Sequence, residues 1–163
     1  MELIPRKIIE TVWIELGQKS HNELLALKES FSESQPQLDR FLLKFTDHIN
    51  QEAIDLTFHY SITIWEIFKQ AFGKPIPEVS NEIIYSCIED REQWLEKVNN
   101  FSYQEIDQLI SNNRTIHQEN ILVYALEAIL EEAEDNLDFN KEDHSYLFWL
   151  ILIVTDAFDK ATS

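Results

Sequence analysis

The chain has 163 residues, of which 30 are Asp or Glu and 13 are Lys or Arg, so its formal net charge is −17. A hydrophobic fraction of 44% and an aromatic fraction of 12% are typical of a folded protein, and the length predicts a single domain over residues 1–163. Two glycines in the whole chain argue against Gly-rich phosphate loops and tight hairpin turns. An acidic surface repels phosphate backbones, so we expect no nucleic-acid partner.

The sequence predicts a cytoplasmic protein. Its single cysteine, Cys87, cannot form an intramolecular disulfide, which fits a reducing compartment. The first residues show no basic segment followed by an apolar one, so no signal peptide is predicted. The longest apolar run, Tyr146–Val154, is about half the length that a membrane span needs, and we expect no membrane partner.

Start and stop signals predict an all-α fold of about eight helices in one bundle-like domain. Pro5 suits a first helical turn, and Gly17 and Gly73 suit helix ends. Capping boxes, in which a Ser or Thr and an acidic or amide residue three positions later bond each other's backbone, are predicted at Ser20/Glu23, Ser102/Glu105 and Thr115/Gln118. The predicted helices span residues 6–16, 21–32, 35–49, 51–72, 81–98, 103–112, 116–137 and 141–160.

The helix predicted over 51–72 carries one polar stripe on an otherwise apolar surface, so it should lie centrally. Asp55, His59 and Glu66 fall on that stripe, since they are spaced by four and seven residues. A carboxylate and an imidazole at this spacing could bind a metal ion or hold a catalytic histidine, if a second helix supplied further ligands. The other interpretation is a stripe that faces water.

The helix predicted over 81–98 has a narrower apolar stripe, which indicates a peripheral helix with one face on the core. Cys87 lies on that stripe, so we interpret it as a buried small apolar residue.

Residues 118–143 form the most acidic part of the chain, with nine Asp or Glu and one Lys. The segment could be a solvated face, a docking surface for a basic partner or a carboxylate metal site. For a docking surface the candidate residues are Glu131, Glu134, Asp135 and Asp138.

The pairs Glu131-x-x-Glu134 and Asp156-x-x-Asp159 resemble the magnesium motif of the all-helical nucleoside triphosphate pyrophosphohydrolases. That resemblance implies Mg²⁺ held between two antiparallel helices. The spacing argues against it, because a helical hairpin turning near residue 139 would separate the two pairs by about 18 Å along its axis. No cofactor is therefore predicted.

The helix predicted over 141–160 is apolar on all sides, so it must be enclosed by its own domain or by another subunit. The second possibility predicts a homodimer.

An internal repeat is predicted between residues 35–72 and 118–161, each forming a helical hairpin. Gln35 aligns with Gln118, and in the second helices Phe58 aligns with Phe148 and Phe68 with Phe158. The shorter flanking helices, 6–32 and 81–112, would correspond as well. Chance similarity between two amphipathic helices is the alternative.

The sequence predicts no assembled catalytic constellation. We therefore interpret the chain as a non-enzymatic interaction or regulatory module with an acidic binding face and, as partner, a basic protein. The alternative is a metal-dependent helical enzyme built on the stripe of residues 51–72.

Overall fold

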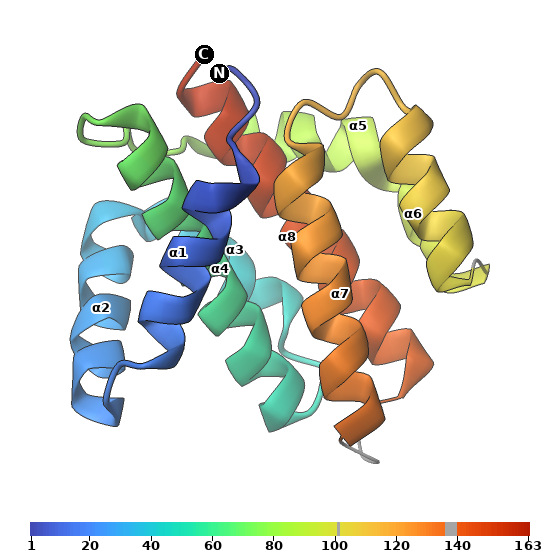
Figure 1. Ribbon diagram of the computed structural model, residues 1–163, viewed down its shortest axis with the longest axis horizontal. Helices are drawn as coiled ribbons and strands as arrows, with labels where there is room; N and C mark the ends of the chain where they lie inside the picture. Colours follow the sequence, from blue (N-terminus) through green and yellow to red (C-terminus); the bar gives the residue numbers. More distant parts are fainter. Residues whose placement is uncertain (101, 136–139) are drawn as a thin grey trace.

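The computed structural model describes residues 1–100, 102–135 and 140–163. Within these ranges the backbone forms eight α-helices and no strand, which confirms the all-α prediction (Figure 1). The helices are α1 (Arg6–Gly17), α2 (His21–Ser34), α3 (Pro36–Phe45), α4 (Gln51–Phe72), α5 (Asn81–Asn100), α6 (Tyr103–Asn112), α7 (Glu119–Asp135) and α8 (Lys141–Ala161). Buried apolar residues from all eight contribute to one core.

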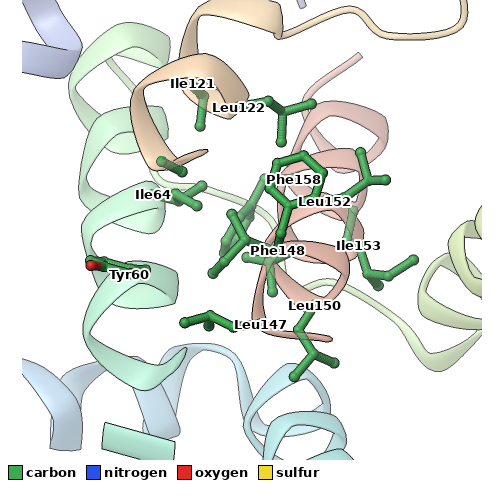
Figure 2. Close-up of a cluster of buried hydrophobic side chains, with 14 of the residues drawn as sticks. Tyr60, Ile64, Ile121, Leu122, Leu147, Phe148, Leu150, Leu152, Ile153 and Phe158 are labelled. Atoms are coloured by element: carbon green, nitrogen blue, oxygen red, sulfur yellow. The ribbon is translucent and has the colours of Figure 1, made fainter. Parts of the chain in front are cut away.

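The centre of the fold is α8, which packs against α4, α5 and α7. Every residue from Leu147 to Thr155 is at most 4% exposed. Side chains of α8 gather in the core with Ile64 of α4 and with Ile121 and Leu122 of α7 (Figure 2). The chain's own helices therefore enclose the helix that is apolar on all sides, and the homodimer stays an untested prediction. No helix in the described ranges combines the length and apolarity required to cross a membrane.

Local capping signals locate most helix starts correctly. The hydroxyls of Ser20 and Ser102 accept hydrogen bonds from the backbone three residues on, and both predicted capping boxes are complete. Two boundaries differ from the prediction by three residues or more. The helix expected over 35–49 ends at Phe45, where Thr46 donates its hydroxyl hydrogen bond to Leu42 O at 2.6 Å.

The other difference is the start of α7, which lies at Glu119 rather than at residue 116. The predicted capping box of Thr115 and Gln118 is wrong because both side chains have other partners. The hydroxyl of Thr115 donates to Asn113 Oδ1 at 2.6 Å, and Gln118 bonds the N-terminal segment. Residues 113–118 form an irregular loop between α6 and α7.

Gln118 and Gln35 make the same pair of contacts with two different segments. Gln118 Nε2 donates to Glu2 O at 3.0 Å, and its Oε1 accepts from Ile4 N at 3.0 Å. Gln35 Nε2 donates to Pro77 O at 3.0 Å, and its Oε1 accepts from Val79 N at 2.8 Å. Each buried glutamine therefore holds, with the same two atoms, the extended segment that leads into a helix: α1 in one case, α5 in the other.

Further contacts of the first half recur in the second half when α1 to α4 are aligned with α5 to α8. Asn50 and Asn140 cap α4 and α8 with their side chains. The aligned residues Phe68 and Phe158 contact each other, with ring centroids 5.6 Å apart, as equivalent residues do on a twofold axis. These matched contacts favour an internal repeat of four helices over chance similarity, and a superposition of the two halves would test it.

Candidate functional site

The exposed side of α7 carries the acidic residues singled out in the sequence. Its buried residues lie on one face, and Glu127, Glu131 and Glu134 follow one another on the opposite face at spacings of four and three. Glu131, Glu134 and Asp135 are exposed, whereas Asp138 lies outside the described residues. The structure therefore places three of the four predicted contact residues together on a surface.

These carboxylates lie at the electrostatically unfavourable end of their helix. The C-terminal end of a helix carries partial negative charge, and the last turn of α7 contains no basic residue. A carboxylate in such a position costs about 0.3–1 kcal/mol of stability. A cation brought by a partner would relieve that cost.

A row of aromatic side chains lies beside the carboxylates. Trp13 of α1 contacts Tyr124 of α7, with ring centroids 4.9 Å apart, and Tyr60 of α4, at 5.4 Å. Trp13 and Tyr124 are partly exposed. Burial raises the pKa of Tyr124, and carboxylates of α1 and α7, among them Glu10 and Glu131, raise it further. Burial, Glu132 and Glu131 likewise raise the pKa of Tyr60.

The carboxylate border extends onto α6. Burial raises the pKa of Tyr103, and Glu127 of α7 and Asp107 of α6 add to the shift. Acidic residues of α1 and α7 therefore border the aromatic row, and Asp107 of α6 continues the border as far as Tyr103. We call this surface the acidic face and define it by Glu10, Asp107, Glu127, Glu131, Glu134 and Asp135.

The predicted metal stripe of α4 does not come together as a set. Asp55 and His59 line a groove of about 430 Å³ between α2 and α4. Glu66 lies two turns further along α4, is not part of that groove, and pairs with Lys69 Nζ at 2.5 Å. Within the described ranges, no three His, Cys, Asp or Glu side chains are grouped as a metal ion would need. The metal-dependent enzyme has no support from this arrangement and stays an untested prediction.

The burial of His59 predicts that the free energy of unfolding depends on pH. Burial lowers its pKa below the ordinary value of 6.5, so the folded chain holds a neutral imidazole where the unfolded chain takes up a proton. Stability should therefore fall as the pH drops through about 6.5, and His59→Gln should remove that part of the slope. Urea unfolding between about pH 7 and pH 5 measures it, with His21→Gln as the exposed control from the same groove. An unchanged slope in His59→Gln would contradict the assignment.

The largest cluster that sequence reasoning missed is centred on Arg91. This residue is 4% exposed and donates from Nε to Asp156 Oδ2 at 2.7 Å. Its terminal nitrogens donate to Thr115 Oγ1 at 2.7 Å and to Thr115 O at 3.0 Å. The signal was present, because Arg91 interrupts the apolar stripe of α5, four residues after Cys87. Cys87 itself is fully buried as predicted, and burial raises the pKa of its thiol to about 12.

The second acidic pair, Asp156 and Asp159, belongs to this cluster and not to a magnesium motif. Asp156 pairs with Arg91, and Asp159 Oδ2 lies 2.8 Å from His117 Nδ1. The carboxylates of Glu131 and Glu134 are elsewhere, on the exposed side of α7.

No family model, curated protein or solved structure matches this chain.

Proposed function

We propose that the chain is a non-enzymatic interaction module that binds a basic partner protein through the acidic face. The observation that carries this proposal is the position of Glu131, Glu134 and Asp135. They are exposed, they share the negative end of α7, and no basic residue accompanies them in its last turn. Glu29 and Glu33 occupy a similar position at the end of α2, so what singles out α7 is the pair of Trp13 and Tyr124 beside its carboxylates.

The aromatic row supports the same proposal. Trp and Tyr are enriched at the centres of protein interfaces, and Arg or Lys side chains stack on their faces. A basic segment lying across α1 and α7 could place its charges on Glu131 and Glu10 while its apolar stems cover Trp13. Charge attraction would make association fast and salt-dependent.

The test uses two matched double variants. Glu131→Lys with Asp135→Lys reverses two charges four residues apart at the end of α7, and Glu29→Lys with Glu33→Lys does the same at the end of α2. Both helices lack a basic residue in the last turn, and all four side chains are exposed. Both variants should fold, since each reversal removes an unfavourable charge at a helix end.

We expect the tagged wild-type chain to retain one basic protein from extract of its native cell at about 50 mM salt and to lose it at about 500 mM. The α7 variant should bind that purified protein about tenfold or more weakly, measured by calorimetry, whereas the α2 variant should bind like the wild type. Equal binding by both variants, or binding that resists high salt, would contradict the acidic face. Failure to retain any basic protein would contradict the proposed function.

A further inference from the structure

A polar cavity of about 450 Å³ lies on another part of the molecule. Its walls come from α5, from the loop 113–118 and from the end of α8. The lining residues are Asp90, Arg91, Arg114, Thr115, His117, Asp156, Asp159 and Lys160. Three of the 13 Lys and Arg side chains thus converge on one cavity of a chain whose net charge is −17.

The three carboxylates of the cavity already have partners within the protein. Asp156 is paired with Arg91, and Asp90 Oδ2 accepts from Lys160 Nζ at 2.7 Å. Asp159 accepts from Gln118 Nε2 at 3.0 Å, contacts His117, and forms an ion pair with the N-terminal ammonium of Met1 at 3.6 Å. For the remaining cation, Arg114, no hydrogen bond or ion pair is found within the described ranges. The unpaired charge in this cavity is therefore positive.

The first half of the chain has apolar residues at the positions equivalent to two of these cations, although Asp156 itself aligns with Glu66, which pairs with Lys69. The backbone N–H groups of Ile4 and Val79 donate to the two glutamines in the same way, so these residues correspond. Leu16 and Arg91 each lie 12 residues further along the chain, so they correspond as well. Leu16 is 3% exposed and belongs to the apolar core. Four residues before Gln35 stands Phe31, which is fully buried against Trp65, whereas four residues before Gln118 stands the exposed Arg114.

The buried charges of Arg91 and Asp156 reduce the stability that this part of the fold could have. Burial raises the pKa of Asp156 even though Arg91 opposes that shift, so the carboxylate is held where ionisation is disfavoured. A buried ion pair contributes little net stability compared with apolar residues of similar volume. Leu16 and Phe31 show that buried apolar side chains can occupy the positions equivalent to Arg91 and Arg114, so stability alone does not explain these two cations.

We infer that this cavity is a binding site for a small molecule carrying an oxyanion, either a phosphate or a carboxylate. Arg114 supplies the unpaired guanidinium. Lys160 lines the same cavity with an ammonium that donates to Ser86 and Asp90 and has a third hydrogen to donate. Arg91 and Asp156 form the rigid wall behind them. The volume falls in the range of cavities that hold small ligands. This inference is independent of the acidic face.

The probes are inorganic phosphate and succinate, titrated separately at constant ionic strength up to about 20 mM. Binding is followed by heteronuclear NMR through the Thr115 amide and the Trp149 indole. Trp149 Nε1 donates to Arg91 O at 2.8 Å, so its signal reports on the wall of the cavity. The indole of Trp13, which packs on Tyr60 and Tyr124, serves as internal control.

We expect saturable shifts of Thr115 and Trp149 with one of the two probes, and the probe that binds identifies the oxyanion. Arg114→Gln should weaken that binding about tenfold or more, because it removes the unpaired charge and leaves an exposed side chain. Arg40→Gln, on the exposed side of α3, should leave it unchanged. The inference is overturned if neither probe gives saturable shifts, or if Arg114→Gln binds as tightly as the wild type.

Discussion

Replacing Arg91 by methionine should lower the free energy of unfolding by about 3–5 kcal/mol, the usual cost of removing one partner of a buried ion pair. The variant leaves the carboxylate of Asp156 buried without its cation, and Thr115 loses two donors. Methionine has nearly the same side-chain volume as arginine. The loss of stability would therefore come from the unpaired polar groups rather than from a cavity.

The double variant Arg91→Met with Asp156→Leu separates this cause from a general loss of packing. It removes both charges and places an apolar side chain at position 91, as Leu16 does at the equivalent position of the first half. We expect it to regain most of the stability lost in Arg91→Met, as judged from urea unfolding at neutral pH. A double variant as unstable as the single one would show that the pair itself is required for folding. It would also weaken the comparison between the two halves.

Phe158→Ala should also lower the free energy of unfolding by about 3–5 kcal/mol, the range measured for buried phenylalanines. Phe158 is fully buried in α8 and contacts the equally buried Phe68 of α4. If the two halves are equivalent, Phe68→Ala should cost a similar amount. Leu43→Ala, at a side chain that is 55% exposed, should change stability by less than about 1 kcal/mol.

A double-mutant cycle on Phe68 and Phe158 measures their contact directly. Each single variant removes the same ring–ring interaction. The double variant should therefore lose less free energy of unfolding than the two single variants lose together. We expect a coupling of about 0.5–1.5 kcal/mol, typical of an aromatic pair. Strict additivity would mean that the two rings do not contribute a shared contact to the core.

Most of the secondary structure could be predicted because its signals are local. Ser20, Asn50, Ser102 and Asn140 cap helices within three residues of themselves, and the sequence shows them directly. The apolar periodicity of residues 51–72 and 141–160 identified the two central helices. The boundary at Thr115 was wrong because its side chain and that of Gln118 bond residues far away in the chain.

The acidic face was partly predictable. The spacing of Glu131 and Glu134 placed them on one side of a helix, but the sequence did not bring Trp13 or Tyr60 beside them. The stripe of Asp55, His59 and Glu66 shows the opposite case. A shared helix face did not make a site, since Glu66 pairs with Lys69 and lies outside the groove that contains the other two.

By itself, the sequence determined which segments are helical, where most of them begin, and which two must be buried. These properties depend on residues at most one or two helical turns apart, so they can be seen in a single chain. Only the tertiary structure decided the partners of the charged groups. Arg91 and Asp156 are 65 residues apart, and their bond forms because burial on two packed helices removes the water that would otherwise solvate both charges.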